Sequence, residues 1–230
     1  MTMAEEDQMA ASNYTLVIGD KNFSSWSLRP WIALKYFEIP FAEECVRLRQ
    51  PESKATILRH SPSGKVPALK DGTRIIWDSL AILEYLADKV GRDRFWPKAD
   101  DARAMARSMV AEMHSGFTAL RTSCPMNVRR RFDDFTLDEP ARRDVVRILT
   151  LWAEARARFG RGGPFLFGTF CAADIFFAPV VSRFMTYGVP VPGFAMTYMQ
   201  AVWEHEWLQA WVEAAEAEEW TIAQYEPPVR

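Results

Sequence analysis

The pattern of apolar and polar positions changes character near residue 90. Before it, short apolar runs alternate with segments of helical spacing, and Asp71-Gly72 is a strong hairpin signal. The order of elements predicts a small mixed sheet with helices on its faces, because one βαβ crossover is followed by a hairpin. We expect strands at 14–19, 41–48, 66–69 and 73–77, and helices at 26–38, 51–60 and 79–90.

After residue 90 only helical spacing occurs, which predicts helices at about 99–121, 139–159, 172–187 and 195–218. Gly91, Pro97 and several charges separate the two parts. The sequence therefore predicts an α/β domain followed by an all-α domain. The expected divisions are a disordered extension at 1–13, the α/β domain at 14–90, a linker at 91–98 and the helical domain at 99–230.

Composition narrows the class of protein. Apolar residues make up 49% of the 230 residues, which is ample for a packed core, and the formal charge of −2 gives no reason to expect nucleic acid or an acidic membrane as a partner. The three cysteines are far apart and form no CxxC motif, and the histidines show no metal-ligand spacing. No signal-peptide pattern and no long apolar run occurs. We therefore expect a soluble, cytoplasmic protein without a metal.

The segment that follows the predicted hairpin combines two features that suit a small ligand. A helix begins at Ser79, where Asp78 or Ser79 can cap free backbone N–H groups and leave a site for a carboxylate. The short strand that begins at Val66 offers unpaired backbone nearby. This combination predicts a site for a peptide-like ligand that carries a carboxylate.

These residues, in this order, resemble the cytosolic glutathione transferase superfamily. Val66-Pro67 is similar to the family's Val-Pro element, in which the proline is cis and the backbone of the preceding residue pairs with the cysteinyl part of glutathione. Asp78-Ser79 is similar to the acidic-or-Gln plus Ser pair that holds the γ-glutamyl end. Lys65 lies where relatives often carry a polar residue, and it is a candidate for attracting a glutathione carboxylate.

The helix near residue 172 also resembles a family element. The family's helix-start box has Ser or Thr, two residues and then Asp, whereas this chain has Cys171 and Asp174. We expect this box to be structural.

The resemblance also implies a catalytic position just after the first strand. The run Ser24-Ser25-Trp26-Ser27-Leu-Arg is similar to the Ser-Ser-Cys-Ser-x-Arg pattern of the zeta and related serine-type classes. Ser24 aligns with the serine that hydrogen-bonds the glutathione sulfur, and Ser25 is the alternative, one residue nearer the helix. Trp26 replaces the cysteine, which disfavours a maleylacetoacetate isomerase and glutaredoxin-like thiol exchange.

The resemblance as a whole implies a thioredoxin-like N-terminal domain, glutathione as co-substrate, a homodimer and a role in detoxification. We expect a transferase that presents glutathione thiolate to a small apolar electrophile entering between the domains. Two alternatives stay open. One is a glutathione-dependent isomerase or peroxidase that uses the same bound thiol, and the other is a non-catalytic binding or interaction module on the same fold.

Overall fold

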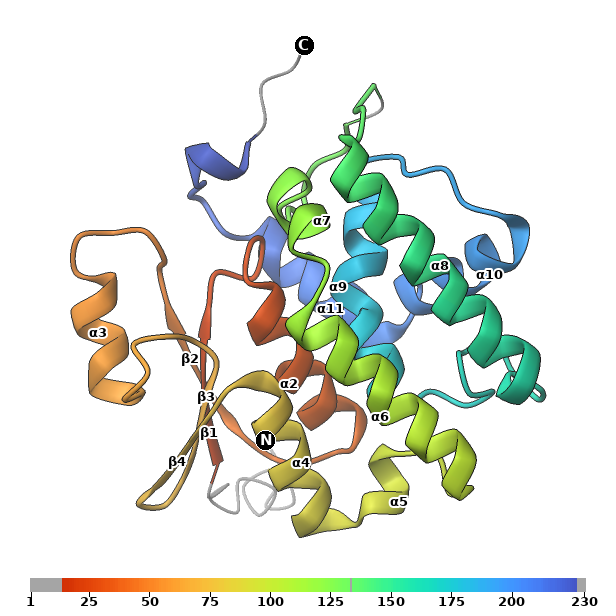
Figure 1. The fold of residues 1–230 in the computed structure, drawn as a ribbon. Coiled ribbons are helices and arrows are strands. Elements are labelled where there is room, and N and C mark those ends of the chain that lie inside the picture. The colour runs from red at the N-terminus through yellow and green to blue at the C-terminus, as the bar shows by residue number, and fades with distance from the viewer. Residues whose placement is uncertain (1–13, 133, 227–230) are drawn as a thin grey trace, which may run out of the picture.

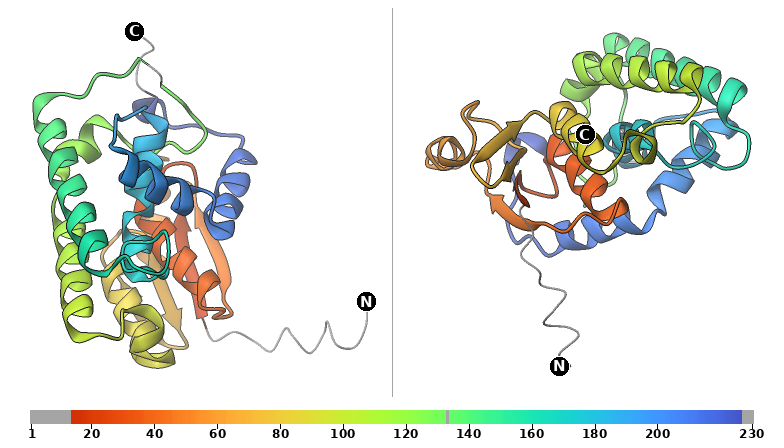
Figure 2. Two further views of the ribbon diagram at one scale, coloured as in Figure 1. Left: turned by 90° about the vertical axis from the view of Figure 1, so that its right-hand side faces the viewer. Right: turned by 90° about the horizontal axis from the view of Figure 1, so that it is seen from below.

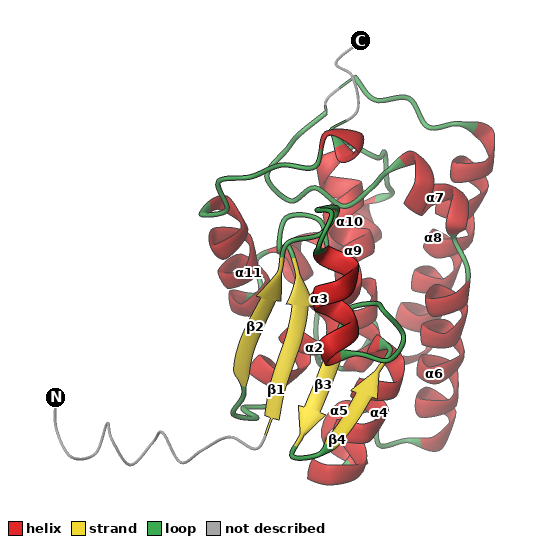
Figure 3. Ribbon diagram, turned by 90° about the vertical axis from the view of Figure 1, so that its left-hand side faces the viewer, coloured by secondary structure: helices red, strands yellow, loops and turns green. Residues whose placement is uncertain are grey.

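A four-stranded mixed sheet forms the first part of the molecule, in a computed structural model that describes residues 14–132 and 134–226. The strand order is β2-β1-β3-β4, with β1 parallel to β2 and antiparallel to β3, and β3 antiparallel to β4 (Figure 3). The extension predicted at 1–13 lies outside the described residues. The strands are β1 (Tyr14–Gly19), β2 (Ala42–Val46), β3 (Ala68–Asp71) and β4 (Arg74–Trp77).

Helices cover both faces of this sheet: α2 (Ser25–Tyr36) and α4 (Ser79–Val90) lie on one face, and α3 (Ser53–His60) lies on the other (Figure 1). The alternation of side chains along β1 explains this arrangement. Leu16 and Ile18 are buried in the main core, whereas Val17 belongs to a smaller core that includes Ile57 of α3. Both faces of β1 are therefore apolar, and each needs a helix to cover it.

The second part of the described chain is helical, as predicted, and its helices α6 and α8 run side by side (Figure 2). This arrangement, together with the sheet, confirms the predicted fold class of an α/β domain followed by an all-α domain. The elements are α5 (Arg92–Phe95), α6 (Asp100–Ser115), α7 (Thr118–Ser123), α8 (Glu139–Phe159), α9 (Ala172–Thr186), α10 (Gly193–Trp203), α11 (Glu206–Glu216) and the 3₁₀ turn η2 (Ala223–Tyr225).

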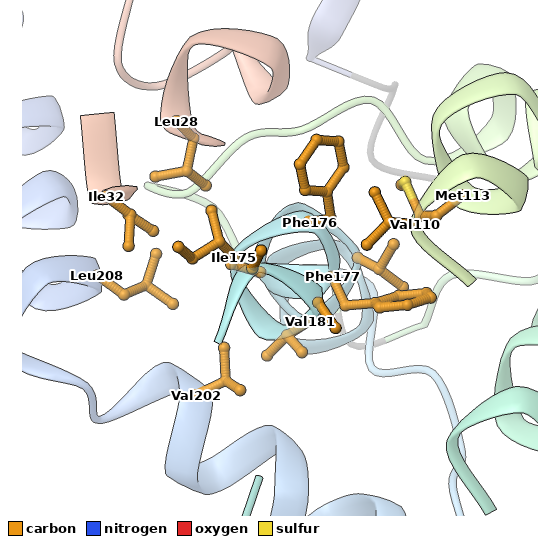
Figure 4. Close-up of a cluster of buried hydrophobic side chains, with 14 of the residues drawn as sticks. Leu28, Ile32, Val110, Met113, Ile175, Phe176, Phe177, Val181, Val202 and Leu208 are labelled. Carbon is orange, nitrogen blue, oxygen red and sulfur yellow. The ribbon is translucent and has the colours of Figure 1, made fainter. Parts of the chain in front are cut away.

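Helix α9 is the centre of the main core, and all but one of its residues are buried. Its side chains meet residues from α2, α6, α10 and α11 (Figure 4), among them Leu28, Val110, Val202 and Leu208. A helix that is surrounded on all sides is apolar around its whole circumference, and α9 fits this description apart from four polar or charged buried residues, which are Asp174, Ser182, Arg183 and Thr186. The core therefore joins the sheet's helical layer to the second part of the chain.

The start of α9 confirms the structural role expected for the box at Cys171 and Asp174. The Asp174 carboxylate accepts hydrogen bonds from the backbone N–H groups of Cys171 at 2.9 Å and Leu166 at 3.1 Å. Burial raises the pKa of Asp174 to about 6, although these hydrogen bonds act to lower it. Asp174 thus satisfies one backbone donor at the N-cap of α9 and one in the segment that precedes it.

Two of the predicted helices are each divided in two. The helix expected over 99–121 ends at Ser115, because Gly116 is extended and Phe117 adopts a positive φ of 55°. The helix expected over 195–218 breaks at His205, whose Nδ1 accepts from the Trp207 N–H and caps α11. The predicted linker at 91–98 contains α5 and buries Phe95 and Trp96.

No helix within the described ranges is both long enough and apolar enough to cross a bilayer.

Candidate active site

A cavity of about 780 Å³ opens beside the N-terminus of α2, between the two parts of the chain. Four of the predicted site residues line it: Ser24, Ser25, Lys65 and Val66. The other three, Pro67, Asp78 and Ser79, are outside the lining, with Pro67 buried directly behind Val66. The structure thus brings the two serines together with Lys65 and Val66 on one cavity. The pair Asp78-Ser79, predicted to hold the γ-glutamyl end, does not line this cavity.

Ser24 precedes α2 as its N-cap residue, yet its side chain makes no capping hydrogen bond. Its hydroxyl donates to the Ser27 Oγ at 2.7 Å, and that oxygen also accepts from the Gly19 N–H at 3.1 Å. A serine at this position is ordinarily a cap, whereas here the Ser24 hydroxyl is paired with the Ser27 hydroxyl instead. Ser24 lines the cavity, so donation to a ligand there would replace its contact with Ser27, while the Ser27 oxygen keeps the Gly19 N–H.

Ser25 is the first residue of α2, and its hydroxyl oxygen accepts a hydrogen bond from Arg183 Nη2 of α9 at 3.2 Å. This contact joins the two parts of the chain at the cavity wall, because the bonded residues are 158 positions apart. Close by, the N–H groups of Trp26 and Ser27 find no acceptor among the described residues. The first turn of α2 therefore presents unpaired donors and the positive end of a helix dipole to the cavity.

Val66 contributes backbone as well as side chain. Within the described part of the chain, neither its N–H nor its C=O takes part in a backbone hydrogen bond. The Val66-Pro67 peptide bond is cis, as the resemblance implies. An extended ligand can therefore pair with Val66 as it would with a strand edge. Lys65, immediately before it, is exposed at the cavity rim.

Asp78 caps α4 as predicted: its Oδ1 accepts from the N–H groups of Leu80 at 2.9 Å and Ala81 at 3.3 Å. Its Oδ2 lies 3.1 Å from His114 Nε2 of α6. Burial acts to raise the pKa of Asp78, but the hydrogen bonds from His114 and from the helix N–H groups outweigh it and lower the pKa. Asp78 is therefore a carboxylate at neutral pH, which is the form that would pair with an ammonium group.

Ser79 is buried, and its hydroxyl accepts from Arg29 Nη1 at 3.3 Å. Arg29 is fully buried as well, with its guanidinium 4.2 Å from the centroid of the Trp26 ring and 4.8 Å from that of Phe176. Burial lowers the pKa of Arg29 well below its usual value, and the nearby Arg183 and Arg121 lower it further. Arg29 thus lies between Ser79 and the wall of the cavity that Trp26 forms.

The charges on the cavity wall all have one sign. Five cationic side chains line it, and none of the described lining residues is Asp or Glu. A wall of this kind favours an anionic ligand, since the charges reinforce one another in a partly enclosed space. The five residues are Arg49, Lys54, Lys65, Arg121 and Arg183.

The segment after α11 closes one side of the cavity. The buried Glu218 carboxylate accepts from the Lys21 N–H at 2.6 Å and the Asn22 N–H at 3.1 Å, in the loop that leads to Ser24. Further along, the Tyr225 hydroxyl accepts from Arg49 Nη2 at 3.0 Å, and Tyr225 lines the cavity. The C-terminal segment therefore both braces the loop before Ser24 and borders the site.

Sequence reasoning missed the residues that the second part of the chain contributes: Arg121, Pro125, Met126, Arg183 and Tyr225. A signal existed for one of them. Arg183 is the only basic residue of α9, a helix whose residues are mostly apolar. A lone charge that a helix buries needs a partner or a function.

None of the residues that the structure describes forms a group of three or more His, Cys, Asp or Glu side chains able to hold a metal ion. Cys45, Cys124 and Cys171 are free thiols, and none lines the cavity. Burial raises the pKa of Cys45 to about 11 and that of Cys124 to about 12. Low thiolate character makes these thiols poor nucleophiles at neutral pH.

Comparison with known proteins matches both parts of the chain. Residues 23–89 match the family model of the glutathione S-transferase N-terminal domain, and residues 127–214 match that of the C-terminal domain. Among curated proteins, rat glutathione S-transferase theta-1 is 38% identical over 96 residues, which is 41% of this chain and 39% of the relative. A probable maleylacetoacetate isomerase of Caenorhabditis elegans is 32% identical over 96 residues, 42% of this chain and 44% of the relative. The chain thus spans about two fifths of the length of these relatives.

Solved structures extend the likeness of fold to nearly the whole chain. A Burkholderia glutathione transferase homologue with bound glutathione superposes with a TM-score of 0.69 at 23% identity, covering 89% of this chain and 99% of the other. The theta-class enzyme of Xanthomonas axonopodis pv. citri, also with glutathione bound, gives a TM-score of 0.62 at 20% identity, covering 87% and 97%. The two domain models and these folds agree with the elements described above, and the chain belongs to the cytosolic glutathione transferase superfamily.

Proposed function

We propose that the protein binds glutathione in the cavity beside α2 and presents its thiolate to an electrophile, as a glutathione transferase. The observation that carries this proposal is the convergence of Ser24, the unpaired N–H groups of α2 and the free backbone of Val66 on one cavity with a cationic wall. Glutathione has a peptide backbone, two carboxylates and a thiol, so each feature has a matching group. The family membership, and the glutathione bound in the Burkholderia and Xanthomonas structures, support the same ligand.

In this proposal Ser24 donates its hydroxyl proton to the glutathione sulfur. A thiol with a pKa near 8.5 is mostly protonated at neutral pH, and a hydroxyl donor together with a helix N-terminus stabilises the thiolate. Ser24 is suited to this role because its side chain is not engaged in capping α2. Ser25 is the alternative donor, although its oxygen already accepts from Arg183.

We place the rest of glutathione along the first 90 residues. The cysteinyl backbone pairs with Val66, next to the cis bond to Pro67. The γ-glutamyl end extends towards Ser79 and the Asp78 carboxylate, which can pair with its α-ammonium group. Lys65 attracts the remaining carboxylate from the rim. The electrophile then enters from the α7 and α9 side.

The body of the electrophile is apolar in this proposal, because Trp26, Pro125 and Met126 line that side of the cavity.

We further propose a homodimer in the cytoplasm, as the resemblance implies. Exposed apolar side chains on β4, Ile75 and Trp77, support an interface there. Gel filtration with light scattering tests the dimer, and a monomer at micromolar concentration would contradict it.

A glutathione-dependent isomerase is the second candidate, favoured by the likeness to the nematode protein named a probable maleylacetoacetate isomerase. Trp26 argues against it, since it occupies the place of the cysteine in the zeta pattern. Direct assay with maleylacetone, a substrate mimic, separates the two candidates. Turnover of cumene hydroperoxide would identify a glutathione-dependent peroxidase. Glutathione binding without turnover of any of these substrates would identify a non-catalytic binding module.

The first experiment is calorimetric titration with reduced glutathione and with S-methylglutathione, in two buffers that differ in heat of ionisation. We expect saturable binding of both, with protons released only by the free thiol. No binding at millimolar concentration would refute the proposed ligand. Binding without proton release would keep the ligand but refute thiol activation.

A further inference from the structure

We propose that Arg121 and Arg183 form a binding site for a carboxylate on the electrophile, so that the acceptor substrate is an anionic molecule with an apolar body. This inference rests on the proposed function, since it concerns the second substrate of the same cavity. It adds that the acceptor substrate carries a negative charge, which neither the resemblance nor the apolar lining of the cavity implies.

The Arg183 guanidinium is positioned by burial and by three hydrogen bonds. Its side chain is 4% exposed, and carbonyl oxygens hold its guanidinium: Nε donates to Cys124 O at 2.8 Å and Nη1 to Pro179 O at 3.1 Å. Nη2 reaches the Ser25 hydroxyl at 3.2 Å. These three bonds use three of the five N–H donors of a guanidinium, so two remain on a residue that lines the cavity.

Arg121 approaches the same space from α7. Its guanidinium donates to the backbone oxygens of His114 and Gly116 and lies 5.1 Å from the centroid of the Trp26 ring. Stacking on an aromatic face fixes the plane of a guanidinium while leaving its edge available. Two guanidinium groups that line one cavity can share a carboxylate, which is the ligand that their fork geometry matches best.

Within the part of the chain that the structure describes, the three arginines of this region have no direct ion-pair partner, and the carboxylates of Asp144 and Asp78 act on Arg121 and Arg29 only at longer range. Among the described residues, no carboxylate forms an ion pair with Arg121, Arg183 or Arg29, and their guanidinium groups donate to neutral acceptors. Burial lowers the pKa of Arg183 to about 10, and the positive charge of Arg121 contributes. Buried cations without an anion are costly, so an anion bound between them would offset both desolvation and mutual repulsion.

Glutathione's own carboxylates do not meet this need. In the proposed placement they lie towards Lys65 and towards the N-terminus of α4. Arg183, by contrast, contacts Ser25 from the α9 side, next to Pro125 and Met126 of the acceptor region. A carboxylate attached to the electrophile would enter beside the sulfur and reach both arginines, with its apolar body against Trp26.

The test compares two glutathione derivatives that differ in one group beyond the sulfur: S-(2-carboxyethyl)glutathione and its amide, S-(2-carbamoylethyl)glutathione. Their dissociation constants are measured by calorimetry, with S-methylglutathione as the reference. We expect the wild-type protein to bind the carboxylate about 10-fold more tightly than the amide, because a hydrogen bond between two charged groups is stronger than one to a neutral amide. In Arg121→Met this preference falls to about 2-fold or less, since one of the two cations is lost.

The matched control is Arg143→Met, which removes the same charge from an exposed residue of α8 and keeps the preference. Arg121→Lys is the second variant: it keeps the charge without the fork, and we expect an intermediate preference. Equal binding of the two derivatives by wild type, or a full preference in Arg121→Met, would overturn the inference. If S-methylglutathione itself does not bind, the proposed function fails, and the inference fails with it.

Discussion

Glu218 is far in sequence from the active-site motifs, yet we expect its replacement to disturb the position of Ser24. Its carboxylate accepts two backbone N–H groups, from Lys21 and Asn22, in the loop between β1 and α2. That loop is tied to Ser24, because the Ser24 N–H donates to Asp20 O at 2.8 Å. Replacing Glu218 with alanine leaves two N–H groups without their acceptor.

The cost follows from these contacts. A hydrogen bond to a charged group contributes about 1.5–3 kcal/mol, and two of them are lost in Glu218→Ala. Burial also raises the pKa of Glu218, which means that the charged carboxylate is partly destabilised by desolvation. This cost offsets part of what the two hydrogen bonds contribute. We therefore expect the free energy of unfolding to fall by roughly 2–4 kcal/mol. In a protein of this size that corresponds to a decrease in melting temperature of roughly 5–15 °C.

The assay is urea denaturation followed by tryptophan fluorescence and circular dichroism, with Glu219→Ala as the matched control. Glu219 is the adjacent acidic residue and is exposed, so its loss should cost less than about 0.5 kcal/mol. We also expect Glu218→Ala to weaken thiol activation, since the loop before Ser24 loses its brace. A loss of stability below about 1 kcal/mol would refute the reasoning that these two bonds hold the loop.

Three further predictions concern the thiol, the core and the pH dependence of stability. Ser24→Ala should raise the pKa of bound glutathione thiol by about one unit, read from thiolate absorbance against pH, while Ser25→Ala should change it less; the reverse order would move the donor role to Ser25. Phe177→Ala should cost about 3–5 kcal/mol, because the ring is fully buried against Trp152. Asp174 has a pKa raised to about 6, so its folded form holds a proton that the unfolded chain releases near 3.8. Its contribution to stability is therefore greatest below about pH 3.8 and is lost as the pH rises through 6, by at most about 3 kcal/mol. Wild type should lose stability relative to Asp174→Asn over that window, and a constant difference between the two would contradict the shifted pKa.

Local signals in the sequence predicted the ends of those helices whose capping residues are adjacent to them in the sequence. Helix α4 begins at Ser79 and ends at Val90 as expected, because Asp78 caps one end and Gly91 follows the other. The break between α6 and α7 was missed, since a single glycine in a helical pattern is compatible with either outcome, and only the tertiary fold gives Phe117 its positive φ. Helix interruption at His205 was missed for a similar reason: a histidine cap acts through a side chain whose direction the pattern does not contain.

The same distinction runs through the candidate site. The resemblance to glutathione transferases predicted Val66, Lys65 and the serine pair as site residues, and the structure places all four on one cavity. Their roles stay a prediction. Arg183 could not be predicted, because its contact with Ser25 spans 158 residues, and no local pattern encodes which loop a buried helix will face. The groups proposed to activate the thiol thus come from short segments near α2, whereas the groups proposed to select the acceptor come from α7 and α9. Changes at Arg121 should therefore alter which electrophile is accepted while leaving the proposed chemistry at sulfur to Ser24 and the N-terminus of α2.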